Sequence, residues 1–287
     1  DTIEAMRMQE SNGYRTENYM LEQAEPELSS CNGPQQPVDK ECRSKMSEWC
    51  FQVVDFCKFN RETVSIAMSF LDRFLMTPSG QDAIMDRKVF QLAAMTSLYT
   101  AIKIHEPEAM EPKVVASLSR GAYTEDEVTD MERRILLAIE WRMNPPTAMS
   151  FVHHFMALMD EGSMSETEMV GTLELAKFQT ELAVNTYEFV GVDASTVAFA
   201  ALSNALQCAD VNRGVEYEFL TRVSQAAEIE ADSDDMMNVQ DQLYDAVQNA
   251  SMGCTSGNLR PMASSKGMGE SSSSIHYSPR SVSAATN

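Results

Sequence analysis

Hydrophobic residues recur every three or four positions along most of the chain, and no segment alternates strictly between polar and apolar residues. This spacing predicts helices, because 3.6 residues per turn place such positions on one face. We expect helices over residues 43–59 and 64–75, and a third over 89–102, which carries no charged residue. A helix without a charged face must be surrounded by other helices. The pattern therefore predicts an all-α protein.

The last helix of the first half carries its own start and stop signals. Thr124 and Glu127 have the spacing of a capping box, in which each residue satisfies the other at the start of a helix. We expect this helix to run to Asn144, because Pro145 and Pro146 follow it. The two prolines also mark a domain boundary.

The second half repeats the plan of the first. Ser165 and Glu168 again have capping-box spacing, and residues 194–209 are again free of charge. The helices that contain Val89 and Met131 have counterparts 105 and 108 residues further along the chain. Such echoes arise by chance in some helical proteins, but two tandem repeats of five helices explain them most simply.

The two ends of the chain differ from this body. Residues 1–37 are polar and rich in turn-forming residues, which predicts a flexible lead-in with one short docking helix at 16–23. Residues 251–287 contain eleven serines and are predicted to be disordered. The two repeats are thus expected at 38–145 and 146–250.

Composition and charge narrow the classes of function. Hydrophobic residues make up 44% of the chain and charged residues 23%, as in soluble globular proteins. The net charge of −21 argues against nucleic acid as a partner, because binding to it relies on neutralising phosphates. No apolar run is long enough for a membrane span or a secretory signal. Proteins are therefore the expected partners.

Catalytic and metal-binding motifs are absent from the sequence. The six cysteines form no CxxC pair, and the four histidines have no ligand spacing, so we expect reduced thiols and no metal site. No glycine-rich phosphate loop, nucleophile elbow or kinase motif occurs. We therefore expect a protein that is not an enzyme and that needs no cofactor.

Four motifs resemble those of one family, the cyclins. They are CRSKMSEW (42–49), SFLDRFL (69–75), LYTAIKIHE (98–106) and YTEDEVTDMERRILLAIEWRMNPPT (123–147), in the family's order. The resemblance implies two stacked five-helix domains, each with its third helix at the centre. It also implies a subunit of the nucleus and cytoplasm that activates a cyclin-dependent protein kinase in the cell cycle. Residues 232–247 resemble the last helix of D-type cyclins.

The resemblance also assigns roles to charged residues. Lys103 and Glu132 occupy the positions that face the kinase. There the ammonium can donate to carbonyl groups of the partner, and the carboxylate can accept from its amide groups. Without the resemblance, Lys103 reads as a cation that caps a helix end, and Glu132 as part of a solvated face. Arg43 and Asp72 occupy the positions of a buried structural ion pair.

The family's groove for RxL-type segments of substrates and inhibitors is only partly matched by this sequence. Cys42, Met46, Trp49 and Gln91 fall at its positions. Lys45 stands where apolar packing is expected, and its charge would repel the arginine of such a segment.

Two other functions remain open. A transcription factor of the same helical fold would bind promoter DNA, which the acidic charge disfavours. A peptide-binding scaffold of this fold would activate no kinase, and co-purification distinguishes it. In the serine-rich tail, Ser278 precedes Pro279 and is the candidate phosphorylation site.

Overall fold

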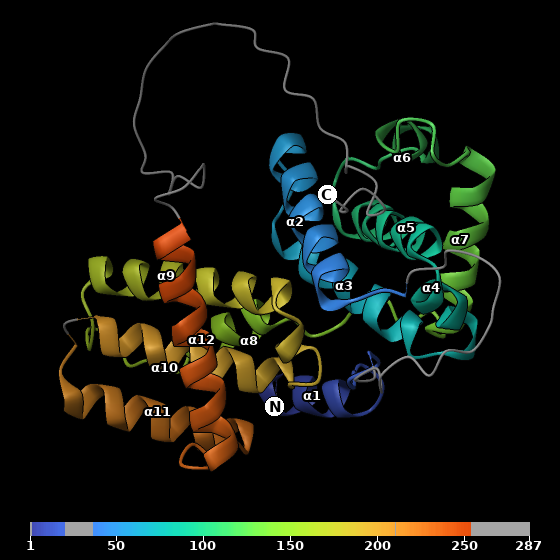
Figure 1. Cartoon of the computed structure of the whole chain (residues 1–287). Coiled ribbons are helices and arrows are strands. Elements are labelled where there is room, and N and C mark those ends of the chain that lie inside the picture. The colour runs from blue at the N-terminus through green and yellow to red at the C-terminus, as the bar shows by residue number, and fades with distance from the viewer. Residues whose placement is uncertain (1, 21–36, 210, 254–287) are drawn as a thin grey trace, which may run out of the picture.

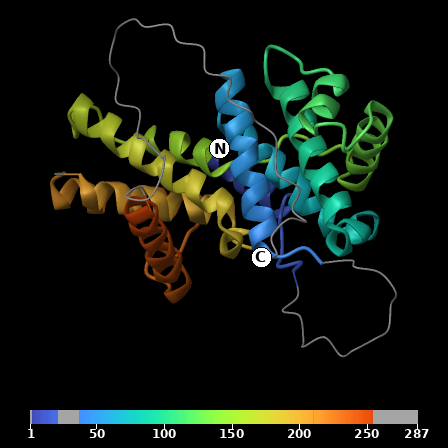
Figure 2. The same ribbon diagram turned by 45° about the horizontal axis from the view of Figure 1, so that its top comes forward.

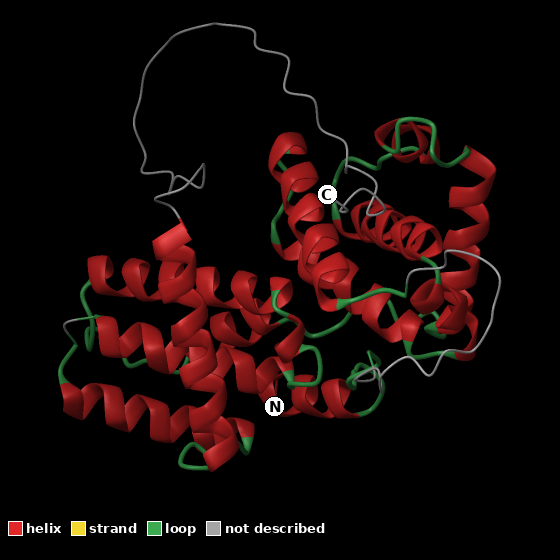
Figure 3. Ribbon diagram, viewed as in Figure 1, coloured by secondary structure: helices red, strands yellow, loops and turns green. Residues whose placement is uncertain are grey.

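The computed structural model describes residues 2–20, 37–209 and 211–253, and every regular element within these ranges is helical (Figure 3). The prediction of an all-α protein is therefore confirmed. The first half contains five main helices: α2 (Lys40–Cys57), α3 (Glu62–Leu75), α5 (Arg87–His105), α6 (Pro112–Leu118) and α7 (Glu125–Ala138). A short 3-10 turn, η1 (Pro78–Gly80), and the short helix α4 (Gln81–Met85) connect α3 to α5.

The second half again contains five helices. They are α8 (Ala148–Met156), α9 (Glu166–Asn185), α10 (Ala194–Cys208), α11 (Arg213–Ala227) and α12 (Asp234–Gly253). A second 3-10 turn, η2 (Tyr187–Phe189), joins α9 to α10. The two groups of helices lie side by side, as the views in Figures 1 and 2 show from two directions. We call them the first and the second repeat.

Each repeat is built around its charge-free helix. Every residue from Phe90 to Ile102 in α5 is buried, and α5 packs against α2, α3, α4, α6 and α7. Helix α10 takes the same place in the second repeat, where α8, α9, α11 and α12 contact it. Burial of apolar surface stabilises a fold by about 25 cal/mol per Å², so these two helices anchor the two cores. The prediction that both segments are central is confirmed.

The two predicted capping boxes are present in the structure. In α7, the Thr124 hydroxyl accepts from the Glu127 backbone N–H while the Glu127 carboxylate accepts from the Thr124 backbone N–H. Ser165 and Glu168 form the same reciprocal pair at the start of α9. Capping boxes involve residues only three apart, which explains why the sequence reveals them.

The end of α7 differs from the prediction. The helix ends at Ala138 and not at Asn144, because Glu140 and Trp141 adopt left-handed backbone angles with φ of 56° and 57°. The Trp141 N–H donates to the Leu136 carbonyl across this reversal, as in a Schellman ending. Residues 139–144 therefore form a turn, which we call the α7 turn.

The lead-in helix was predicted in the wrong place. The helix is α1 (Thr2–Ser11), and residues 16–20 of the predicted helix are not helical, while 21–23 lie outside the described residues. Residues 2–20, which we call the N-terminal arm, pack on the body instead of forming a flexible lead-in. Helix α1 contacts α8 and α11 of the second repeat (Figure 1). At the other end α12 continues to Gly253, and the rest of the predicted tail lies outside the described residues.

Neither a membrane-spanning helix nor a cluster of metal ligands occurs among the described residues. None of their helices is both long and apolar enough to cross a bilayer. No group of three or more histidine, cysteine or acidic side chains among them is placed to hold a metal ion.

Candidate functional site

The structure brings Lys103 and Glu132 together. Lys103 lies in the last turn of α5, where the buried helix reaches the surface, and Glu132 lies in the middle of α7. The Lys103 Nζ atom lies 3.0 Å and 3.3 Å from the two carboxylate oxygens of Glu132. The two residues therefore form one charged unit between neighbouring helices.

The two side chains differ in exposure. The Lys103 side chain is 48% exposed, whereas that of Glu132 is only 11% exposed. Partial burial would lower the pKa of Lys103, but the hydrogen bond and charge of Glu132 outweigh it and raise this pKa. The ring of Tyr99 lies 5.4 Å from the Lys103 ammonium on its other side. The ammonium is thus held in place and still has surface available to a partner.

Large apolar side chains are exposed at the ends of the two helices that carry this pair. Ile104 follows Lys103 directly and is exposed, and Trp141 in the α7 turn is 65% exposed. His105 ties the two segments together, because its Nε2 atom lies 3.0 Å from the Met143 carbonyl oxygen. We call Lys103, Ile104, Glu132 and Trp141 the Lys103 face. Exposed large apolar side chains, tryptophan above all, are enriched at the hot spots of protein-binding surfaces.

The apolar part of this face was not predicted from the sequence. The available signals were an isoleucine directly after Lys103 and a tryptophan directly after the last turn of α7. Neither signal separates an exposed side chain from a buried one, because both residue types occur more often in cores.

Arg43 and Asp72 form a second pair, in the interior. The Arg43 guanidinium donates from Nε to Oδ1 of Asp72 at 2.9 Å and from Nη2 to Oδ2 at 2.7 Å. Both side chains are almost fully buried. Burial opposes the charge on Arg43, but the carboxylate and hydrogen bonds of Asp72 outweigh it and raise the pKa of Arg43. The geometry is that of a structural ion pair.

This pair links more segments than α2 and α3. Arg43 also donates from Nη1 to the carbonyl oxygen of Val184 in α9 at 2.9 Å, and Tyr19 of the N-terminal arm donates to Asp72 at 2.7 Å. The ring of Tyr187 packs edge-on against Tyr19 at 5.5 Å. The pair therefore joins the first repeat, the second repeat and the arm in one buried network. Sequence analysis identified only its two charged members.

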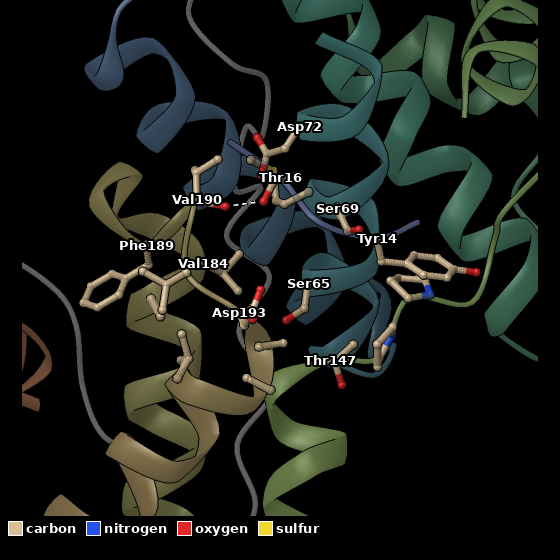
Figure 4. A pocket seen from close by; sticks show the side chains of 18 of the residues that line it. Tyr14, Thr16, Ser65, Ser69, Asp72, Thr147, Val184, Phe189, Val190 and Asp193 are labelled. Carbon is tan, nitrogen blue, oxygen red and sulfur yellow. Dashed lines mark hydrogen bonds between the residues drawn. The ribbon is translucent and has the colours of Figure 1, made fainter. Parts of the chain in front are cut away.

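A cavity of about 140 Å³ lies beside this network, between the two repeats. Figure 4 shows Ser65 and Ser69 of α3 on one side of it, Val184 on another, and Thr147 at the start of α8. Its lining is mostly apolar with several hydroxyl groups, and it has room for ordered water.

Comparison with known proteins now identifies the family. The model for the N-terminal cyclin domain matches residues 1–144, and the model for the C-terminal cyclin domain matches residues 146–285. The chain belongs to the cyclin family. The two five-helix repeats are thus its two cyclin domains, as the sequence motifs implied.

Relatives of this cyclin are distant. It is 33% identical to G1/S-specific cyclin-E1 of Gallus gallus over 114 residues, which are 40% of this chain and 27% of the relative. It is 28% identical to G2/mitotic-specific cyclin-B1 of Oryzias javanicus over 175 residues, which are 61% of this chain and 41% of the relative. The chain therefore spans less than half the length of either relative. Neither is a D-type cyclin, so the expected D-type kinship gains no support.

A solved structure agrees with the fold of this cyclin. A viral cyclin from herpesvirus saimiri superposes with a TM-score of 0.59 at 16% identity, over 86% of this chain and 98% of the viral one. At this identity the likeness concerns the fold alone. It confirms the prediction of a cyclin fold.

The predicted docking groove of this cyclin presents little surface. Cys42, Met46 and Trp49 lie on α2, Gln91 lies on α5, and all four side chains are buried. The Tyr123 hydroxyl donates to Gln91 at 3.1 Å, whereas the Trp49 indole N–H is buried without a hydrogen-bond acceptor. A buried donor without a partner is costly to the folded state.

The structure describes Lys45 but not the candidate phosphorylation site. Lys45, expected to repel a cationic ligand, is paired with Glu41 at 2.7 Å, which offsets part of its charge. The candidate phosphorylation site Ser278 lies outside the described residues.

Proposed function

We propose that this cyclin is a regulatory subunit that binds a cyclin-dependent protein kinase through the Lys103 face and activates it, without catalysing a reaction itself. The observation that carries the proposal is the Lys103–Glu132 pair, fixed where buried α5 reaches the surface. Exposed Ile104 and Trp141 supply the apolar contact that such a pair alone would lack.

The proposed mechanism is a shift in the kinase's conformational equilibrium. The Lys103 ammonium donates to carbonyl groups of the partner's regulatory helix, and Ile104 and Trp141 pack against its apolar side chains. If these contacts form only with the active conformer, their binding energy raises its population. The kinase then completes its own Lys–Glu pair and metal site, so ATP and magnesium belong to the partner.

The biological setting is also part of the proposal. Cyclin-E1 is named for the G1/S step and cyclin-B1 for the G2/mitotic step, which supports a role in cell division without selecting a stage. We propose that this cyclin acts in the nucleus and cytoplasm, with protein partners and without nucleic-acid or membrane binding. Substrates or inhibitors of the kinase are further candidate partners, at the predicted groove for RxL-type segments.

Binding to a purified cyclin-dependent kinase, identified by affinity purification with this cyclin, tests the proposal. Lys103→Ala and Glu132→Ala should each weaken binding by about 2–4 kcal/mol, as hot-spot charges do. The double variant should lose less than the sum, because each residue positions the other. Lys40→Ala is a matched control. Lys40 also forms an ion pair, with Glu188 at 2.9 Å, and it does not belong to the Lys103 face.

Thermal melting of the same variants separates binding from folding. Lys103→Ala leaves the nearly buried Glu132 carboxylate without its cation, so a small loss of stability is expected there. If both single variants melt near the wild type and still bind and activate the kinase normally, the proposed function is wrong even though the fold is right.

A further inference from the structure

The α7 turn holds Trp141 in an unfavourable backbone conformation. Glu140 and Trp141 are consecutive, carry side chains, and both have positive φ. Such residues persist only where their surroundings hold them, and they are frequent at functional sites. Because Trp141 is also exposed, its own side chain contributes little to holding the turn.

Three different segments hold this turn through three consecutive carbonyl groups. Arg73 of α3 donates to the Arg142 carbonyl at 2.9 Å, and the His105 ring meets the Met143 carbonyl at 3.0 Å. Gln9 of the N-terminal arm donates to the Asn144 carbonyl at 2.8 Å. The turn is therefore fixed between the end of α5 on one side and the arm on the other.

The arm reinforces this arrangement at two more points. The Arg142 side chain crosses the arm and donates to the Asn12 carbonyl, and a side chain at Gly13 would collide with it. The Tyr14 ring stacks on the Arg73 guanidinium at 4.7 Å. Arg73 is almost fully buried and has no carboxylate partner among the ion pairs of the described residues. The cation–π contact with the Tyr14 ring is therefore a main source of stabilisation for the buried guanidinium charge. Burial lowers the pKa of Arg73 to about 10.

We propose that the N-terminal arm is a positioning element of the Lys103 face, which fixes the α7 turn, and with it Trp141, for the kinase. This inference rests on the proposed function. The arm itself contributes Gln9 and Tyr14 to the turn and to Arg73, and neither residue belongs to the Lys103 face. Loosening the arm should therefore weaken kinase binding from a distance, through Trp141.

The first measurement needs no kinase. The protein has two tryptophans, so Trp49→Phe leaves Trp141 as the sole tryptophan, which is excited selectively at wavelengths that tyrosine does not absorb. In this background, Tyr14→Ala and Gln9→Ala should increase the fast local component of the time-resolved anisotropy decay of Trp141. Met8→Ala is the matched control, because Met8 is exposed on the same arm helix and should leave the decay unchanged. An unchanged decay in both Tyr14→Ala and Gln9→Ala would overturn the proposal.

The second measurement is kinase affinity in a double-mutant cycle. Tyr14→Ala should weaken binding about fivefold or more in the wild-type background, within the usual range of coupling between sites. The same change should have less than about a twofold effect in Trp141→Ala, because the residue through which the arm acts is gone. An equal loss in both backgrounds would show that Tyr14 acts otherwise and would overturn the proposal.

The two measurements separate failure of this inference from failure of the proposed function. If the wild type binds no cyclin-dependent kinase, the proposed function is wrong, and the arm cannot influence kinase binding. The anisotropy result still decides whether the arm fixes the turn. If the wild type binds and Trp141→Ala binds equally well, the proposed function stands on Lys103 and Glu132, and the positioning role is refuted.

Discussion

Arg43→Ala should destabilise the protein more than any change at the Lys103 face. The substitution removes three hydrogen bonds, two to Asp72 and one to the Val184 carbonyl. It leaves the Asp72 carboxylate only 7% exposed, with the Tyr19 hydroxyl as its remaining side-chain donor. Water in the neighbouring cavity could donate a hydrogen bond to Asp72, but it carries no charge to offset the carboxylate.

The expected magnitude follows from these losses. Breaking a buried ion pair by removing one partner costs about 3–5 kcal/mol. The Val184 carbonyl loses its bond from Arg43 as well, and an unsatisfied buried acceptor costs about 1–3 kcal/mol. Native proteins have a total stability of about 5–15 kcal/mol, so Arg43→Ala should remove a large part of it. Because Val184 lies in α9, the contact between the two repeats should loosen together with the first repeat.

A double variant isolates the cause. Replacing the pair by apolar residues, Arg43→Met with Asp72→Leu, removes both charges and fills similar space. The Tyr19 hydroxyl and the Val184 carbonyl still lose partners, so this variant should cost less than Arg43→Ala but more than nothing. Urea unfolding followed by far-ultraviolet circular dichroism gives the free energies of unfolding for wild type and both variants.

The comparison has a clear point of failure. If the double variant is as unstable as Arg43→Ala, the isolated carboxylate is not what destabilises the single variant, and the loss that both variants share, the bond from Arg43 to the Val184 carbonyl, is the cause instead. If Arg43→Ala unfolds within about 1 kcal/mol of wild type, Asp72 has found another partner and the reasoning from burial is refuted.

Three further outcomes are expected. Glu10→Ala should lower the melting temperature relative to Glu4→Ala by removing about 1–2 kcal/mol of stability, since the buried Glu10 carboxylate caps α10 through the Ser195 N–H at 2.9 Å. Burial raises the pKa of the Cys50 thiol to about 12, above its unfolded value near 9, so this thiol's contribution to stability is complete below pH 9 and is lost as pH rises from about 9 to 12. Cys50→Ala should flatten that part of the pH profile in urea titrations. An RxL peptide should bind weakly by fluorescence polarisation, and Lys45→Ile should strengthen it; unchanged affinity would remove Lys45 from the argument.

Local signals explain how much of the fold was predictable. A charge-free run such as 89–102 and a capping box such as Thr124 with Glu127 depend on residues within a few turns of one another. The burial of α5 and the start of α7 therefore followed from sequence. The end of α7 did not, because the proline stop signal at 145 lies beyond a turn in which Glu140 and Trp141 take left-handed angles that neither residue type favours.

The N-terminal arm shows why the rest was out of reach. Helix α1 contains a glutamate, Glu10, that is buried against Ser195, 185 residues further along the chain. A polar segment is predicted to be flexible when the residues on which it packs are unknown. Only contacts with those residues offset the conformational entropy that the segment loses on ordering. The position of Tyr14 was unpredictable for the same reason. Its partner Arg73 belongs to a family motif in the sequence, and nothing there shows that Arg73 is a buried cation in contact with Tyr14.

The two ion pairs of the first repeat differ in function because they differ in burial. Each joins a basic and an acidic residue 29 positions apart on two helices, Arg43 to Asp72 and Lys103 to Glu132. The bidentate guanidinium is enclosed and its three hydrogen bonds go to Asp72 and Val184 within the protein, so its removal is a folding defect. The Lys103 ammonium is half exposed and can bond a partner without giving up Glu132. The same sequence pattern can therefore specify a structural pair or a binding pair, and the exposure of the cation decides which.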